Sequence, residues 1–239
     1  MKENKYDDNI FFQKYSQMSR SQQGLAGAGE WETLRKLLPD FKDKRVLDLG
    51  CGYGWHCIYA MEHGASSVVG VDISHKMLEV AKEKTHFPQV EYKCCAIEDV
   101  EFPEESFDVI LSSLAFHYVA DYEILVKKIY RILKSGGNLV FTAYGTQDWY
   151  YNEKGEILHF PVDNYYYEGK RTAVFLGEKV TKFHRTLTTY LNTLLSNGFI
   201  INHIVEPQPP ENMMDIPGMQ DEMRRPMMLI VSANKKVDR

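Results

Sequence analysis

Hydrophobic positions follow two alternating patterns along the chain. Short, nearly continuous apolar runs alternate with longer stretches in which apolar residues recur every three or four positions. The short runs are typical of strands buried on both faces, and the longer stretches are typical of helices with one buried face. We expect strands over residues 45–49, 67–71, 89–94, 107–112, 138–143, 199–205 and 227–233, and helices over 30–38, 53–62, 74–84, 121–133 and 187–195.

Strands in alternation with helices favour an α/β fold, in which helices cover both faces of a mostly parallel sheet. The last two expected strands follow each other without a long helix between them. This spacing predicts that the two strands form an antiparallel hairpin. With the five earlier strands they make a seven-stranded sheet, and the hairpin lies at its edge.

Two segments depart from the alternation. Residues 1–40 predict an N-terminal helical arm, and residues 41–239 predict the main domain. Within that domain, residues 145–185 form a polar stretch rich in aromatic side chains, and a gap of this length is usually a lid or binding loop. The aromatic rings fit a flat or apolar small molecule, a cation, or equally a lid that packs on itself or on a second subunit. They belong to Trp149, Tyr150, Tyr151, Phe160, Tyr165, Tyr166 and Tyr167.

Composition and charge exclude several classes of protein. With 239 residues, 44% of them hydrophobic and 26% charged, the chain is typical of a globular domain and not of a disordered one. A net charge of -5 argues against non-specific binding of nucleic acid through its phosphates. We expect no membrane helix, because no apolar run approaches the roughly 20 residues needed. The polar start of the chain is not a secretory signal, which predicts a cytoplasmic protein. Four cysteines, expected as reduced thiols, are Cys51, Cys57, Cys94 and Cys95.

A glycine-rich turn follows the first expected strand in the sequence VLDLGCGYG, residues 46–54. Glycines there let a ligand approach the backbone, and the next helix offers free N–H groups. The spacing is G-x-G-x-G and not the dinucleotide pattern G-x-G-x-x-G. Asp48 precedes Gly50 by two positions, and its carboxylate disfavours a pyrophosphate but suits a cationic amino acid.

A second acidic residue, Asp72, ends the second expected strand, 22 positions after Gly50. A carboxylate at this point can accept hydrogen bonds from both hydroxyls of a ribose. Alternatively, Asp72 caps the helix that opens near Ser74. The preceding glycine turn favours ribose binding.

The motifs VLDLGCGYG and VGVDIS, followed by CAIED, SFDVILS and LKSGGNL, resemble those of the class I S-adenosylmethionine-dependent methyltransferases, in particular the type 11 domain of small-molecule methyltransferases. The resemblance covers about residues 45–143. It implies a Rossmann-like sheet, S-adenosylmethionine as the cofactor and S-adenosylhomocysteine as its product.

The resemblance also implies the roles of individual residues. At the position of Cys95, many relatives carry an Asp that accepts the adenine amino group, and Glu98 is the substitute here. An arm in such enzymes often folds over the cofactor, which points to Tyr15 and to Arg20 at the carboxylate. Met77 closes the adenine pocket or is plain core. The implied contacts are Asp48, Gly50, Cys51 and Gly52 at the methionine part, Asp72 at the ribose, Ile73, Met77, Ala96, Ile97 and Glu98 at the adenine, and Ser112 and Ser113 at the amino group and methyl.

Two histidines are candidates for catalysis. His117 follows the fourth strand, at a position that faces the substrate in relatives, and a neutral imidazole can act as a general base. The alternative is a packed or solvent-facing histidine at the start of a helix. His184 borders the aromatic stretch. We expect no metal, because His56 and Cys57 lack further ligands at metal spacing.

The function expected is methyl transfer to an O, N or C atom of a small molecule. Nucleic-acid methylases that modify amino groups usually carry Asn or Asp and then Pro-Pro-Tyr or Pro-Pro-Phe after the fourth strand, where this chain reads SSLA, residues 112–115. We therefore expect no nucleic-acid partner and no membrane, and a monomer or homodimer. Two alternatives stay open: a nicotinamide-dependent Rossmann oxidoreductase, and a protein that binds S-adenosylmethionine without catalysis.

Overall fold

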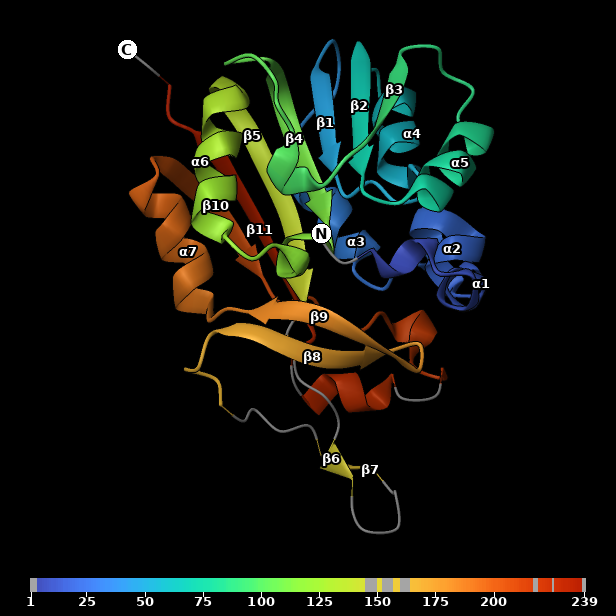
Figure 1. Cartoon of the computed structure of the whole chain (residues 1–239). Coiled ribbons are helices and arrows are strands. Elements are labelled where there is room, and N and C mark those ends of the chain that lie inside the picture. Colours follow the sequence, from blue (N-terminus) through green and yellow to red (C-terminus); the bar gives the residue numbers. More distant parts are fainter. Residues whose placement is uncertain are drawn as a thin grey trace.

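The computed structural model describes residues 4–144, 150–151, 157–159, 164–216, 219–224 and 226–237. Its centre is a seven-stranded sheet in the order β10-β11-β5-β4-β1-β2-β3 (Figure 1). β11 runs antiparallel to both of its neighbours, while the other pairs are parallel. The α/β fold and its antiparallel edge hairpin are confirmed. The strands are β1 (Arg45–Leu49), β2 (Ser67–Asp72), β3 (Val90–Cys94), β4 (Phe107–Ser113), β5 (Leu133–Tyr144), β10 (Phe199–Val205) and β11 (Met228–Lys235).

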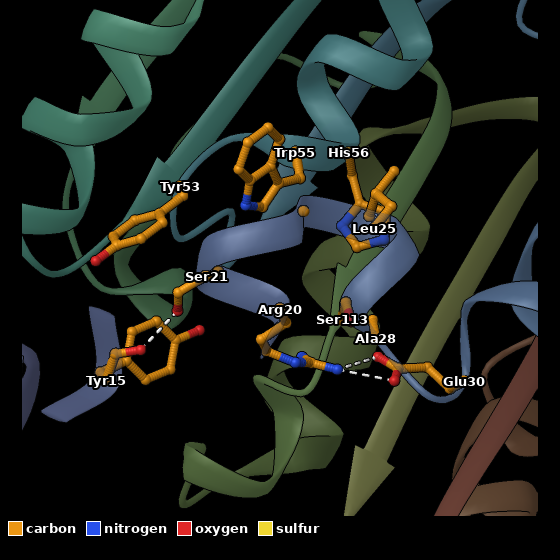
Figure 2. Close-up of a pocket in the computed structure, with 12 residues that line it drawn as sticks. Tyr15, Arg20, Ser21, Leu25, Ala28, Glu30, Tyr53, Trp55, His56 and Ser113 are labelled. Atoms are coloured by element: carbon orange, nitrogen blue, oxygen red, sulfur yellow. Dashed lines mark hydrogen bonds and ion pairs between the residues drawn. The ribbon is translucent and has the colours of Figure 1, made fainter. Parts of the chain in front are cut away.

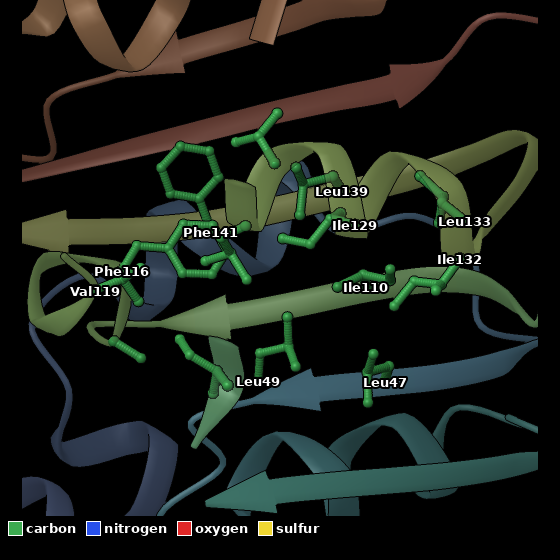
Figure 3. Close-up of a cluster of buried hydrophobic side chains, with 14 of the residues drawn as sticks. Leu47, Leu49, Ile110, Phe116, Val119, Ile129, Ile132, Leu133, Leu139 and Phe141 are labelled. Atoms are coloured by element: carbon green, nitrogen blue, oxygen red, sulfur yellow. The ribbon is translucent and has the colours of Figure 1, made fainter. Parts of the chain in front are cut away.

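Helices cover both faces of this sheet, because successive strand side chains point to opposite sides. In β1, Val46 packs against one group of helices, and Leu47 and Leu49 pack against the other. The larger core lies beneath α6 and α7 and is closed by Phe116 and Phe141 (Figure 3). The covering helices are α3 (Trp31–Leu34), α4 (Trp55–Glu62) and α5 (His75–Lys84) on the first face, and α6 (Tyr122–Ile132) and α7 (Leu187–Ser196) on the second.

The N-terminal arm is more broken than the sequence predicts. The helix expected over 30–38 divides into α3 and a short 3-10 turn, and Leu38 is extended. The ring of Pro39 explains this change, since it disfavours helical backbone in the residue before it. The other arm elements are η1 (Lys5–Asp7), α1 (Asn9–Ser16), α2 (Ser19–Gln23), η2 (Gly24–Gly27) and η3 (Arg35–Leu37).

An antiparallel hairpin stands outside the main sheet, within the segment expected as an irregular lid. It consists of β8 (Gly169–Phe175) and β9 (Glu178–His184), joined by Leu176 and Gly177. Both turn residues have positive φ, 55° and 77°, which matches the twist of a two-residue hairpin turn. The hairpin packs against the arm in a small core of its own, made by Phe11, Ala173 and Val180 with Tyr6, Phe175 and Leu176 around them.

The remaining elements are short. β6 (Tyr150–Tyr151) pairs with β7 (Ile157–His159). Trp149 and Phe160, and the side chains of Tyr150 and Tyr151, lie outside the described residues, so the expectation for these aromatic rings stays a prediction. Four 3-10 turns complete the list: η4 (Ile97–Asp99), η5 (Phe116–Tyr118), η6 (Glu211–Met213) and η7 (Gln220–Arg224).

Candidate cofactor and acceptor site

The glycine turn connects β1 to α4 at the carboxyl end of the parallel strands. Gly50, Gly52 and Gly54 have φ values of 79°, 52° and 76°, a region that L side chains rarely adopt. A Cβ on Gly50 would lie 2.4 Å from Ala115 Cβ, and one on Gly54 would lie 2.2 Å from the Tyr92 hydroxyl. A Cβ on Gly52 would meet nothing within 4 Å. Gly50 and Gly54 therefore serve packing, whereas Gly52 borders open space that a ligand can enter.

Asp48 lies beneath this turn and is 1% exposed. Its Oδ2 accepts a weak hydrogen bond from Cys57 Sγ at 3.5 Å, and its Oδ1 has no hydrogen-bond partner among the described residues. Burial raises the pKa of this carboxyl to about 7, with a smaller contribution from the charge of Asp72. Because a buried carboxylate is costly without a partner, the orphaned oxygen suits a cationic group such as an amino group.

Asp72 joins the glycine turn to the start of α5. Its Oδ2 accepts from the Gly52 N–H at 2.9 Å, and its Oδ1 accepts from the Ser74 N–H at 2.9 Å. Burial raises the pKa of Asp72 to about 6 in spite of these hydrogen bonds. The N-cap of α5 is Ser74, whose hydroxyl accepts from the Met77 N–H. A carboxylate has about four lone-pair sites, so Asp72 can accept further hydrogen bonds from a ribose.

The residues expected around the adenine lie where β2 and β3 end. The Cys95 N–H donates to Asp72 O at 3.0 Å, which holds the two strand ends together. Met77, Ala96 and Ile97 are buried, while Ile73 and Glu98 are partly exposed. The Glu98 carbonyl accepts from Lys128 Nζ at 2.8 Å. Met77 is 2% exposed, which fits its alternative as core.

Ser112 and Ser113 end β4, and their side chains have different surroundings. The Ser112 hydroxyl is buried and donates to Leu49 O at 2.8 Å, so it ties β4 to β1. Ser113 is partly exposed and lines a pocket together with Gly50. Ser113 is therefore the better placed of the two to face a ligand.

This pocket lies between the arm and the glycine turn (Figure 2). The guanidinium of Arg20 projects into it and pairs with Glu30, with Nη2 2.6 Å from Oε1 and 2.8 Å from Oε2. Eight of the twelve lining residues were not predicted as site residues from the sequence, among them Glu30, Trp55 and His56. Glu30 has no local motif, because its contact depends on how the arm folds back on itself, whereas Trp55 and His56 directly follow the glycine turn. Burial lowers the pKa of His56 to about 4, so its imidazole is neutral near pH 7.

His117 lies on η5, just beyond the pocket-lining Ser113. It is 1% exposed, and burial, together with the charges of Lys182 and Arg185, holds its pKa well below the usual value. The Tyr118 hydroxyl lies 3.1 Å from the Tyr6 hydroxyl. The ammonium of Lys182 lies 5.9 Å from the centre of the Tyr118 ring. The arm, η5 and β9 thus bring polar groups together around His117.

The chain is similar in sequence and fold to several known proteins. A family model described as a methyltransferase domain matches residues 47–141. A solved structure from Listeria monocytogenes, assigned to the S-adenosylmethionine-dependent methyltransferases, is 54% identical; the match covers 89% of this chain and 99% of that one, with a TM-score of 0.83. An S-adenosylmethionine-dependent methyltransferase from Mesorhizobium loti is 39% identical over 89% of this chain and 100% of its own, with a TM-score of 0.80. The chain belongs to the class I S-adenosylmethionine-dependent methyltransferases.

The predicted family and its cofactor, S-adenosylmethionine, are thereby confirmed, and the comparisons give no support to a nicotinamide-dependent oxidoreductase. An uncharacterized protein of Haemophilus influenzae is 32% identical to this methyltransferase over 96% of both chains. Further curated methyltransferases match at 28% to 35% identity, and the chain spans only 26% to 55% of their length. Their substrates therefore do not identify the acceptor.

The second catalytic candidate, His184, is 3% exposed, and its Nε2 lies 2.7 Å from Tyr165 O. The neighbouring Arg185 donates to the carbonyls of Phe116, Val119 and Ala120, so it fixes η5 in the methyltransferase. These contacts fix backbone segments, and the catalytic roles of His117 and His184 stay predictions.

Among the described residues, no group of three or more His, Cys, Asp and Glu side chains could hold a metal ion, and no helix is long and apolar enough to span a membrane.

Proposed function

We propose that this methyltransferase moves the methyl group of S-adenosylmethionine to an O, N or C atom of a small-molecule acceptor. The observation that carries the proposal is the buried Asp48 oxygen without a partner among the described residues, two positions before the turn in which Gly52 borders open space. When bound, S-adenosylmethionine supplies an electrophilic methyl group on a sulfonium sulfur. The chain has to hold this group in line with the acceptor atom and exclude water.

The site residues divide this work among them. Asp48 receives the amino group of the methionine part, and Asp72 receives the ribose hydroxyls. Gly52 permits close approach of the backbone, and Arg20 faces the carboxylate. Tyr15, Arg20 and Ser113 line the same pocket (Figure 2). The arm supplies two of these residues, which supports its predicted position over the cofactor.

The acceptor is proposed to bind on the His117 side. A neutral imidazole there can take a proton from a hydroxyl, amine or thiol acceptor. The arm and the hairpin pack together through Phe11 and Phe175, whose ring centres lie 5.7 Å apart, and in this proposal they shield the acceptor from water. A cytoplasmic location, the lack of a nucleic-acid or membrane partner, and a monomer or homodimer stay predictions.

Two measurements test the proposal. A thermal-shift titration with S-adenosylhomocysteine, NADH and NADPH should raise the melting temperature only with the first, by roughly 3 °C at about 100 times the dissociation constant. A screen of small-molecule acceptors with radiolabelled S-adenosylmethionine should then show transfer that Asp72→Ala abolishes. Transfer only to protein or RNA contradicts the small-molecule acceptor, and binding without turnover on any acceptor favours the non-catalytic alternative.

A further inference from the structure

The carboxylate of Glu30 is buried at the wall of the arm pocket, where its side chain is 2% exposed. Glu30 directly precedes α3, and its partner Arg20 belongs to α2, 10 positions earlier. Figure 2 shows the two side chains meeting end to end in the pocket. The proposed function assigns no role to Glu30.

Burial makes the pair interdependent. A buried carboxylate is costly unless it is paired and hydrogen-bonded, and Arg20 provides that pairing. One guanidinium nitrogen, Nη2, lies within hydrogen-bond distance of both carboxylate oxygens. Because the guanidinium is planar and rigid, two contacts on Nη2 restrict the directions in which its other nitrogens can point. Glu30 therefore sets the orientation of the Arg20 head group.

The Arg20–Glu30 pair lies beside the proposed binding site for the methionine part of the cofactor. The pocket is also lined by Gly50 and Ser113, which belong to the methionine end of the cofactor site. Asp48 lies below the same turn as a negative group for the amino end. A positive group is needed on the opposite side for the carboxylate of the same amino acid, and Arg20 is the cation that lines the pocket. A fixed guanidinium receives a carboxylate at a smaller entropic cost than a freely moving one.

We propose that Glu30 is a positioning residue, which holds Arg20 so that its guanidinium receives the carboxylate of the methionine part of the cofactor. The inference rests on the proposed function and goes beyond it by assigning a residue that does not contact the cofactor. The competing explanation is structural, since the same ion pair ties α2 to α3 within the arm. The two explanations differ in what they predict for a ligand without a carboxylate.

The test compares two ligands and two variants of the full chain. S-adenosylhomocysteine carries the amino acid, and 5′-deoxy-5′-methylthioadenosine keeps the adenosine and sulfur but lacks it. Glu30→Gln is the test variant. Glu32→Gln is the matched control, because Glu32 lies two positions further along, in α3, and pairs with Arg35 at 2.8 Å, but is 60% exposed. Dissociation constants are measured by calorimetry, with melting temperatures recorded alongside.

Glu30→Gln should raise the dissociation constant of S-adenosylhomocysteine about 10-fold, which corresponds to about one charged hydrogen bond. The dissociation constant of 5′-deoxy-5′-methylthioadenosine should rise by less than about 2-fold. Glu32→Gln should change neither. Glu30→Asp, which keeps the charge but shortens the reach to Arg20, should show the same selective loss and serves if Glu30→Gln does not fold. An equal loss for both ligands, or no loss for S-adenosylhomocysteine, overturns the positioning role. Failure of the unmodified protein to bind S-adenosylhomocysteine refutes the proposed function instead.

Discussion

The carboxylate of Asp7 accepts a hydrogen bond of 2.6 Å from the hydroxyl of Ser74, a residue 67 positions further along the chain. It also accepts from the Lys76 N–H at 3.1 Å and lies 3.4 Å from the His75 nitrogen. An acidic side chain at the N-terminus of a helix is favourable, because the first N–H groups have no partner in the helix. The arm is thus fastened to the start of α5, directly after Asp72.

Loss of this fastening should loosen the arm and leave the sheet intact. For Asp7→Ala we expect faster proteolysis of the first 30 or so residues and weaker binding of S-adenosylhomocysteine, by roughly 5-fold, the size of one lost cap of about 1 kcal/mol. Asp8→Ala is the control, because Asp8 caps α1 through Ile10 and Phe11 without contact to α5 in the hydrogen bonds described. Equal effects of the two variants on binding would contradict the role of Asp7.

Removal of the Asp72 carboxylate should abolish cofactor binding. Asp72→Ala loses the hydrogen bonds that the carboxylate accepts from the ribose hydroxyls and from the Gly52 N–H, each worth about 1.5–3 kcal/mol, so affinity for S-adenosylhomocysteine should fall at least about 100-fold. Asp108→Asn is the control, since Asp108 pairs with Lys134 at 2.9 Å, near the opposite end of β4. It should lower the melting temperature without changing the dissociation constant.

Cofactor binding should release protons near neutral pH. The raised pKa values of Asp48 and Asp72, about 7 and about 6, leave both groups partly protonated in the free protein. A cationic amino group beside Asp48 favours its ionised form. Affinity for S-adenosylhomocysteine should therefore rise from pH 5.5 to about 7.5 and level off above that. Calorimetry in buffers of different ionisation enthalpy measures the release, and Asp48→Asn should remove most of it.

The same two carboxyls have the opposite effect on the free protein. Their folded pKa values lie above the unfolded values near 3.8, so the folded state binds more protons between about pH 4 and pH 7. The free energy of unfolding should then fall, on their account, as pH rises through this window. Denaturation of Asp48→Asn at pH 5 and pH 7.5 should show a smaller decrease than the unmodified protein, and an equal decrease would contradict the raised pKa of Asp48.

Substitutions at two glycines of the turn should have different effects on ligand binding and on the stability of the fold. Gly52→Ala places a methyl group in open space, so the fold should bear only the backbone strain of positive φ, about 1–2 kcal/mol, while the ligand loses its close approach. Gly54→Ala drives its Cβ into the Tyr92 hydroxyl and should destabilise the fold more severely. Melting temperature and affinity for S-adenosylhomocysteine, measured on both variants, check this difference.

Elements whose pattern is local were predictable from the sequence. The strands of the parallel sheet have nearly continuous apolar runs, and β10 matches its expected bounds. The glycine turn and the place of Asp72 at a strand end were predictable, because a short apolar run that ends in G-x-G-x-G is a clear local signal, whereas their binding roles stay predictions. The β8–β9 hairpin was missed because aromatic and polar residues around it obscure its alternation, although Gly177 marks the turn.

The contacts that could not be predicted join distant positions. Glu30 belongs to no sequence motif. Its pairing with Arg20 arises only because α2 folds back toward α3. Ser112 matched the expected position, yet only the structure shows its hydroxyl turned to Leu49 O. Sequence spacing indicates which strand end a residue occupies, but the direction of its side chain depends on packing with neighbouring strands.

The small core shared by Phe11, Ala173 and Val180 joins two segments from distant parts of the chain. Lys14 Nζ also donates to Leu176 O at 3.0 Å across this junction. The arm and the hairpin are therefore coupled mechanically, and a displacement of one has to carry the other with it. A substitution in this small core should then disturb both segments at once, although it lies far apart in sequence from the glycine turn.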